Sequence, residues 1–274
     1  MPITIKTLVA PLRVFTREQQ LTNSLAIHEI RGKYSSGIYS IIWILATPLV
    51  TLSVYTFIFG YVLKSSFHGL QSAKSMGTYG LGLFTGLVLW DFFSSVLSQS
   101  PYAITSKPNY VKKIVFPLNI LPLVLTSVAL FHFLVNFCVL LLGVLLIGTQ
   151  PAWRIMVIPL LLAPILFYTA GLSWFLASIG VYFRDLGNAI PPFLQLLWFG
   201  SAIFFPIESV PAQFRFLFYI NPISAMVDTA RNYAILGQSL NVPIIFYHLL
   251  AGWVTACTGL YFFDKTKAGF ADVL

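Results

Sequence analysis

Residues 130–148 read LFHFLVNFCVLLLGVLLIG, a run of 19 residues that contains no Asp, Glu, Lys or Arg. About 20 mainly apolar residues in a helix are enough to cross the hydrocarbon core of a bilayer. A strand of a membrane barrel would instead alternate between apolar and polar residues, and this run does not alternate. The run therefore predicts a membrane-spanning α-helix.

The composition extends this conclusion to the whole chain. Of its 274 residues 58% are hydrophobic and 9% are charged, and the mean hydropathy is +0.85. Soluble domains carry about a quarter charged residues, and a chain of this length has too few polar groups to cover its surface in water. We therefore expect an all-α polytopic membrane protein with six spans. The predicted spans are about 40–62, 79–99, 118–148, 154–182, 189–206 and 243–263.

The segment 207–240 interrupts this pattern. It contains apolar residues, but Pro211, Arg215, Pro222, Asp228 and Arg231 divide them, so that no apolar window of about 20 residues is left. Non-helical backbone at membrane depth is tolerated only where protein or a water-filled cavity surrounds it. The segment is therefore predicted to form a pair of short re-entrant helices between spans five and six.

The basic residues predict the orientation, because cytoplasmic loops carry an excess of Lys and Arg. With both termini in the cytoplasm, 11 of the 16 basic residues lie inside and 5 lie outside. The inner set is Lys6, Arg13, Arg17, Arg31, Lys33, Lys107, Lys112, Lys113, Arg184, Lys265 and Lys267, and the outer set is Lys64, Lys74, Arg154, Arg215 and Arg231. This topology and anionic lipid headgroups explain the net charge of +8, so a nucleic-acid partner is not expected.

The predicted organisation has three parts: an N-terminal segment 1–37, a single transmembrane domain 38–264 and a tail 265–274. Residues 8–34 mix apolar and basic residues at helical spacing, which is typical of an amphipathic helix in the membrane interface. Such a helix serves either as a simple anchor or also as a surface for a cytoplasmic partner.

Two cytoplasmic loops also allow two interpretations. Residues 100–117, SPYAITSKPNYVKKIVFP, are either a basic stop signal or a short docking helix for a cytosolic subunit. The turn 182–190, YFRDLGNAI, contains Arg184 and Asp185, which either cap and anchor the helix end or form a pair that changes as helices tilt.

Ionisable residues within the spans are few, and each is a functional candidate because such residues are costly in lipid. They are Asp91, His132 and His248. One carboxyl group and two scattered imidazoles make a poor proton relay, and no H-E-x-x-H or G-x-S-x-G motif is present. The sequence also lacks G-x-x-x-x-G-K-[ST]. We therefore expect no enzyme activity and no cofactor in this chain, with any nucleotide energy supplied by another subunit.

Aromatic residues make up 16% of the chain, and some of them recur at helical spacing within the spans. Packing against lipid and other helices is the common use of such residues. The functional interpretation is an aromatic path for a long saccharide, because aromatic faces pack against the C–H faces of sugar rings. The candidates are Tyr39, Trp43, Tyr55, Phe59, Trp198 and Phe205.

Four stretches, in this order along the chain, resemble the type-2 ABC transporter permeases that export polysaccharide or polyol phosphate. The resemblance covers about residues 24–263 and is closest to permeases for O-antigen, teichoic acid and related capsule polymers. The stretches are 25–63 (LAIHEIRGKYSSGIYSIIWILATPLVTLSVYTFIFGYVL), 80–123 (GLGLFTGLVLWDFFSSVLSQSPYAITSKPNYVKKIVFPLNILPL), 182–190 (YFRDLGNAI) and 200–238 (GSAIFFPIESVPAQFRFLFYINPISAMVDTARNYAILGQ). Asp91 departs from the family pattern, in which another polar residue, often uncharged, is expected.

The resemblance implies a homodimer in the bacterial cytoplasmic (inner) membrane, with two copies of a cytosolic ABC ATPase that binds the ATP and Mg. A lipid-linked polysaccharide would pass between the two permease copies. The resemblance also implies roles for three sets of residues. The ATPase-coupling set is Tyr110, Val111, Lys112 and Lys113, with Arg184 and Asp185 from the cytoplasmic turn; the entrance set is Arg31 and Lys33; the outer-gate set is Pro206, Pro211, Asn221, Pro222 and Arg231.

Two alternatives share part of this pattern. A type-2 permease that exports a drug or a small lipid would have the same fold. A membrane enzyme that modifies glycans would instead show activity as the purified chain alone, without ATP.

Overall fold

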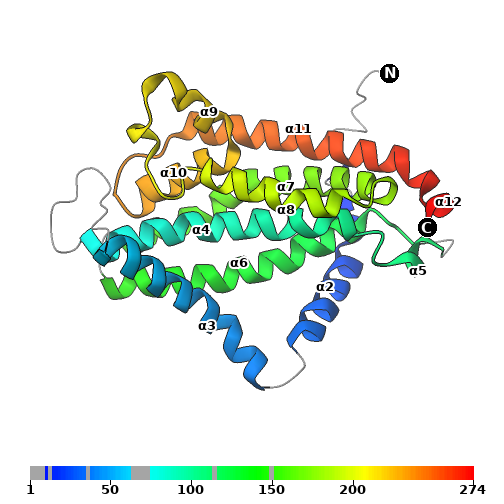
Figure 1. Cartoon of the computed structure of the whole chain (residues 1–274), viewed down its shortest axis with the longest axis horizontal. Coiled ribbons are helices and arrows are strands. Elements are labelled where there is room, and N and C mark those ends of the chain that lie inside the picture. Colours follow the sequence, from blue (N-terminus) through cyan, green and yellow to red (C-terminus); the bar gives the residue numbers. More distant parts are fainter. Residues whose placement is uncertain (1–9, 12–13, 35–37, 63–74, 113–115, 148–150) are drawn as a thin grey trace.

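Helix α6 (Ile120–Ile147) contains residues 130–147 of the long apolar run. A computed structural model of the chain describes residues 10–11, 14–34, 38–62, 75–112, 116–147 and 151–274, and all regular secondary structure in these ranges is helical (Figure 1). The prediction of an all-helical fold is confirmed.

Five helical stretches are long and apolar enough to cross a membrane, and they correspond to five of the six predicted spans. The first joins α3 (Ile38–Tyr55) to one π-helical stretch (Thr56–Val62), and the second joins α4 (Ser75–Gln99) to a 3-10 turn (Ser100–Tyr102). The third is α6. The fourth joins a 3-10 turn (Ala152–Met156) to α7 (Val157–Tyr182), and the fifth joins α11 (Val242–Thr266) to a 3-10 turn (Lys267–Gly269) and α12 (Phe270–Val273).

The sixth predicted stretch, 189–206, differs from the others. Helix α8 (Leu186–Phe199) has 14 residues and is therefore about 21 Å long, shorter than the hydrocarbon core. Residues 200–205 then form turns and bends, and Ala202 has a φ of +49°, a conformation that side chains other than glycine rarely adopt. The helix therefore ends at Phe199, although the sequence stays apolar beyond that residue.

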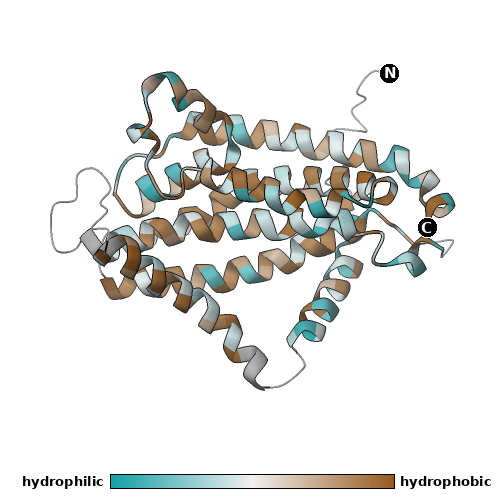
Figure 2. Ribbon diagram, in the orientation of Figure 1, coloured by the Kyte–Doolittle hydropathy of each residue, from teal (hydrophilic) through white to brown (hydrophobic). Residues whose placement is uncertain are grey.

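Helix α4 lies in the middle of the bundle and contacts α6, α7, α8 and α10 (Pro222–Ala234) (Figure 1). Most of its side chains are buried, as Leu81, Leu83 and Val88 illustrate with 0% exposure. The other long helices carry exposed apolar residues, such as Leu146 on α6 and Leu160 on α7, and Figure 2 shows apolar colouring along these helices. An exposed apolar surface of this extent is typical of contact with lipid or with another membrane chain.

Helices α7 and α11 form the most extensive helix pair in the chain. Glycines allow their backbones to touch: a Cβ atom added to Gly259 would lie 2.1 Å from the carbonyl oxygen of Gly171, and one added to Gly171 would lie 2.3 Å from that of Thr255. Small residues at a helix contact are a common device for close packing in membranes. The pair therefore depends on the absence of side chains at these positions.

Helices α2 (Gln19–Tyr34) and α3 lie at the edge of the bundle and diverge from it (Figure 1). On α2 only Thr22 and Ala26 are buried, while Ile27 is 50% exposed. On α3, Trp43 is 63% exposed and Val50 is 55% exposed. A single copy of the chain thus leaves both helices largely uncovered.

The bundle has two distinct ends. At one end lie α5 (Pro108–Val111), the turn between α7 and α8, and α12 with the C-terminus, and we name it the α5 end (Figure 1). At the other lie two short 3-10 turns (Ile207–Ser209 and Ala212–Phe214) and α9 (Arg215–Ile220), and we name it the α9 end. The topology predicted from the sequence places these two groups of residues on opposite sides of the membrane.

Candidate functional site

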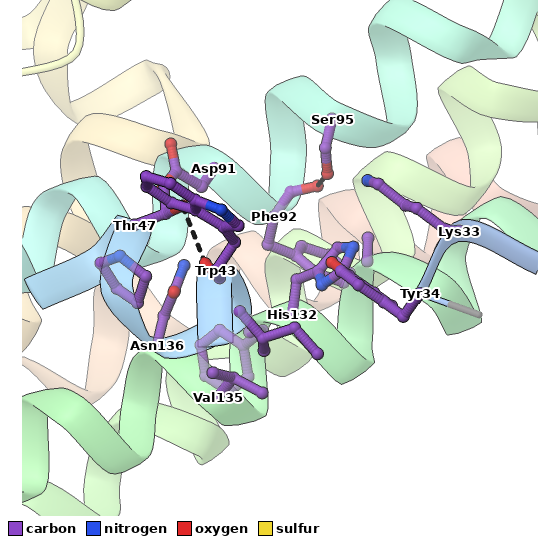
Figure 3. A pocket seen from close by; sticks show the side chains of 14 residues that line it. Lys33, Tyr34, Trp43, Thr47, Asp91, Phe92, Ser95, His132, Val135 and Asn136 are labelled. Atoms are coloured by element: carbon purple, nitrogen blue, oxygen red, sulfur yellow. Dashed lines mark hydrogen bonds between the residues drawn. The ribbon is translucent and has the colours of Figure 1, made fainter. Parts of the chain in front are cut away.

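A cavity of about 380 Å³ lies between α2, α3, α4 and α6 (Figure 3). We name it the Asp91 cavity. Aromatic and apolar groups make up part of its wall, among them Trp43, Phe92 and Phe133. Its polar lining residues are Lys33, Tyr34, Thr47, Asp91, Ser95, His132 and Asn136.

Among the described residues of this wall Asp91 is the one that is acidic, and its side chain is exposed to the cavity. Within the described ranges its carboxylate has no hydrogen-bond or ion-pair partner. The hydroxyls of Thr47 and Ser95 line the same space, but they donate to the carbonyl oxygens of Trp43 at 2.9 Å and Phe92 at 3.1 Å within their own helices. A carboxylate at membrane depth without a protein partner is costly, so Asp91 is a candidate for contact with a polar ligand.

A basic and an acidic side chain lie on opposite sides of the cavity. Figure 3 places Lys33, from the last turn of α2, and Asp91, from the middle of α4, on opposite sides of the space. The Tyr34 ring meets the His132 ring edge to face, with centroids 6.0 Å apart. Partial burial raises the pKa of Tyr34 above its ordinary value, so its hydroxyl keeps its proton at neutral pH. The cavity thus offers an ammonium group and a phenol on one side, and a carboxylate and an amide on the other.

Of the two predicted entrance residues, Lys33 lines this cavity and Arg31 does not. The Arg31 side chain is exposed in the last turn of α2.

The predicted aromatic path is only partly assembled in one copy of the chain. Tyr55 and Phe59 stack with centroids 5.9 Å apart, and Phe59 and Trp198 both contact Phe204, at 5.5 Å and 4.9 Å. Phe205 packs against Phe218 instead, at 5.6 Å. Three of the six predicted aromatics therefore meet in one cluster.

The other predicted aromatics lie apart from this cluster. Trp43 lines the Asp91 cavity. Tyr39 belongs to α3, but its side chain is outside the described residues.

Phe204, which joins the aromatic cluster, was not predicted. It lies in the bend after α8, and its carbonyl oxygen accepts a hydrogen bond of 3.0 Å from the hydroxyl of Tyr79. The residue pair Phe204–Phe205 is visible in the sequence, but nothing in the sequence indicates which of the two rings turns toward Trp198.

The bend itself is held by side chains from α10. The buried guanidinium of Arg231 donates to the carbonyl oxygens of Ala202 at 3.1 Å, Ile203 at 3.3 Å and Phe205 at 3.2 Å. It also forms an ion pair of 2.7 Å with Asp228, whose other oxygen accepts from the Asn232 side chain at 3.0 Å. We name Arg231, Asp228 and the carbonyl groups that bind Arg231 the Arg231 network. It satisfies backbone carbonyl groups of the bend that follows the end of α8.

The remaining predicted gate residues shape the same region. Asn221 caps α10 by accepting from the backbone N–H of Ile223 at 3.0 Å, and it donates to the carbonyl oxygen of Gly200 at 3.2 Å. Pro222 occupies the first turn of α10, where its missing N–H costs no helical bond. Pro206 and Pro211 precede the two 3-10 turns of the α9 end.

The predicted coupling residues gather at the α5 end. Tyr110 and Val111 belong to α5, Lys112 follows it with an exposed side chain, and Lys113 lies outside the described residues. Arg184 and Asp185 are exposed in the turn before α8 and, within the described ranges, take part in no ion pair.

The segment before α5 packs directly against that turn. A Cβ added to Gly187 would lie 2.1 Å from the Tyr102 ring, and one added to Gly180 would lie 2.2 Å from the carbonyl oxygen of Pro101. The two predicted cytoplasmic loops therefore form one surface.

Residues 20–234 match the family profile described as ABC-2 type transporter. The match covers most of the chain and includes the Asp91 cavity, α5 and the Arg231 network.

Individual proteins of known name are also similar to this chain. An O-antigen export system permease protein RfbA of Klebsiella pneumoniae is 26% identical over 250 residues, which cover 90% of this chain and 92% of that protein. The protein of the same name from Myxococcus xanthus is 23% identical over 208 residues, 75% of this chain and 76% of that protein. A polysialic acid transport protein KpsM of Escherichia coli is 23% identical over 244 residues, 85% of this chain and 90% of that protein.

Proposed function

This chain belongs to the ABC-2 type transporter family, and from that premise we propose that it is the permease subunit of an ATP-driven exporter of a lipid-linked polysaccharide. The observation that carries the proposal is the similarity, over most of its length, to permeases named for O-antigen export and polysialic acid transport. The membrane is the bacterial cytoplasmic membrane, and both termini lie in the cytoplasm.

Six crossings of the membrane follow if α8 and the bend 200–206 together make the fifth. Helix α8 alone is too short to cross the membrane, but the bend supplies the missing length. The Arg231 network supports this interpretation, because it satisfies backbone carbonyl groups of the bend. In this topology α9 and α10 form the re-entrant pair within 207–240. Residues 1–37 contain the interfacial helix, 38–264 form one permease domain and 265–274 are a cytoplasmic tail.

A cytosolic ABC ATPase provides the energy, with two copies bound to a permease homodimer. This chain binds no cofactor itself, and the partner binds ATP and Mg. The docking surface consists of α5 and the turn between α7 and α8. The coupling residues are Tyr110, Val111, Lys112, Lys113, Arg184 and Asp185, and the close packing of Tyr102 on Gly187 supports a single surface.

The exposed apolar side chains on α3 and α8, such as Trp43 and Leu196, support a second copy as the neighbour of this chain, with the polysaccharide passing between the copies. In this arrangement the aromatics Tyr39, Trp43, Tyr55, Phe59, Trp198 and Phe205 line the path. The gate at its outer end consists of Pro206, Pro211, Asn221, Pro222 and Arg231.

The Asp91 cavity fits the part of the substrate where phosphate and sugar meet. Lys33, with Arg31 nearby on α2, is suited to the phosphate groups of the lipid carrier. Asp91 and Asn136 are suited to sugar hydroxyls, and Trp43 offers an aromatic face. The cavity therefore matches an entering ligand that is anionic at one end and hydroxylated at the other.

Reconstitution of the chain with its cognate ATPase tests the proposal. We expect the two proteins to co-purify and lipid-linked glycan to stimulate ATP hydrolysis. Lys112→Glu is expected to weaken that assembly about tenfold, because it reverses a charge on the docking surface. Lys267→Glu, also exposed at the α5 end, is the matched control.

Stimulation by a drug or a small lipid but not by glycan would favour the alternative family activity. Activity of the purified chain without ATP would instead indicate an enzyme. Normal assembly of the Lys112→Glu variant would remove the reason for assigning α5 to docking.

Replacing Asp91 by asparagine tests the cavity separately. The change keeps the size of the side chain but removes the charge that strengthens hydrogen bonds from hydroxyl donors. We expect glycan export to fall about tenfold, with ATPase assembly unchanged. Asp264→Asn, an exposed carboxylate on α11, is the matched control, and wild-type export by the Asp91→Asn variant would exclude a substrate role for this carboxylate.

A further inference from the structure

Within the described ranges, helix α2 forms one ion pair with the rest of the chain, and its partner lies in the segment that precedes α5. The carboxylate of Glu29 pairs with the ammonium group of Lys107, and the two residues are 78 positions apart in the sequence. The Lys107 side chain is 27% exposed and the Glu29 side chain 30%, so the pair is screened less than an ion pair in open solvent. With Gln99, Tyr102 and Ser106 they line a cavity of about 310 Å³.

Lys107 is joined directly to the predicted docking helix. It is the N-cap residue of α5, and its carbonyl oxygen accepts a hydrogen bond of 3.1 Å from the backbone N–H of Tyr110. A movement of α5 therefore moves the partner of Glu29.

Glu29 is also one helical turn from the Asp91 cavity. Lys33 lies four residues later on the same face of α2, and both Lys33 and Tyr34 line that cavity. Helix α2 packs against α6, but of its side chains only Thr22 and Ala26 are buried, and the Ile27 side chain beside them is half exposed. A helix that buries so few side chains against the bundle can shift as a unit when its ionic partner moves.

From this arrangement we infer that the Glu29–Lys107 pair couples the docking helix to the entrance of the Asp91 cavity, an inference that rests on the proposed function. Displacement of α5 by the ATPase pulls on Glu29, and the rigid turn from Glu29 to Lys33 carries that displacement to Lys33 and Tyr34. Glu29 and Lys107 are thus positioning residues, which set when the cavity accepts its substrate, and neither one contacts the substrate.

Charge reversal tests the inference in the full complex with its ATPase. We expect Glu29→Lys and Lys107→Glu each to lower the glycan exported per ATP hydrolysed at least about fivefold, the lower range of coupling between two sites. Assembly with the ATPase and the basal ATPase rate should not change. The exchanged pair, Glu29→Lys with Lys107→Glu, should recover most of the export.

The pair Asp264–Lys267 provides the control, because it joins neighbouring turns at the same end of the bundle and its reversal disconnects no element. A purely stabilising role of Glu29–Lys107 would lower the melting temperature and leave export per ATP unchanged. That result, or an exchanged pair that recovers nothing, would overturn the inference.

A distance measurement separates failure of the inference from failure of the proposed function. Spin labels at the exposed positions His28 and Asn109, in a chain without Cys138 and Cys257, report on α2 and α5. We expect their distance to keep one value through the nucleotide cycle in the native pair and to broaden in Glu29→Lys. An equally broad distance in the native pair would overturn the inference, whereas a wild-type complex that exports no glycan would overturn only the proposed function.

Discussion

Methionine in place of Arg231 is expected to lower the stability of the chain by about 3–5 kcal/mol and to abolish export. The guanidinium is fully buried and donates to three carbonyl groups and to Asp228. Removing one partner of a buried ion pair leaves the other charge uncompensated, which accounts for a cost of this size. Thermal unfolding of the detergent-solubilised chain should show a midpoint lower by roughly 10 °C.

Two further variants make this prediction specific. Arg17→Met removes the same side chain from an exposed position, where it is 86% exposed, and should leave the midpoint unchanged. Combining Arg231→Met with Asp228→Asn should be less harmful than the sum of the two single changes, because no buried charge is then left alone. Additive losses would show that the ion pair is not the main element of the network.

Alanine at Gly259 is the second change with a large expected effect. Its Cβ atom would lie 2.1 Å from the carbonyl oxygen and 2.7 Å from the carbonyl carbon of Gly171. These atoms belong to the backbone of α7 and cannot rotate away, so the two helices must separate along their contact. We expect a loss of about 3 kcal/mol, measured by the same thermal unfolding.

Gly200→Ala is the matched control for this change. Gly200 has a φ of −81°, and the nearest atom to an added Cβ is the carbonyl oxygen of Leu197 at 3.6 Å, an ordinary contact. Equal stability of the two variants would mean that α7 and α11 adjust to an extra methyl group and are not locked by Gly259.

The long helices are predictable from sequence because each depends on local composition alone. The runs around α3, α4, α6, α7 and α11 are apolar for about 20 residues or more, and hydropathy in one window reports that directly. The end of α8 is different, because residues 200–205 are as apolar as the helix before them. The bend there depends on Arg231 and Asn221, which lie more than 20 positions later and donate hydrogen bonds to the carbonyl groups of the bend.

Part of the candidate site was predictable from the sequence, because some of its residues stand out individually. Lys33, Trp43 and Asp91 each stand out in the sequence, as a basic residue beside a span, an aromatic residue and an acidic residue inside a span. These residues meet Asn136 in one cavity because of the way four helices cross, and the periodicity of the sequence does not indicate that crossing. The pair Glu29–Lys107 joins two ordinary charges 78 residues apart, and no local pattern indicates it.

The Arg231 network has a consequence for how this sequence tolerates change over time. Arg231 and Asn221 bind the backbone carbonyls of Gly200, Ala202, Ile203 and Phe205, and every amino acid supplies such a carbonyl. Substitution at these four positions is therefore restricted by volume and backbone angle and not by hydrogen-bonding chemistry. Among related chains the bend should drift in sequence while the arginine and asparagine that hold it stay, so its shape is inherited through residues outside it.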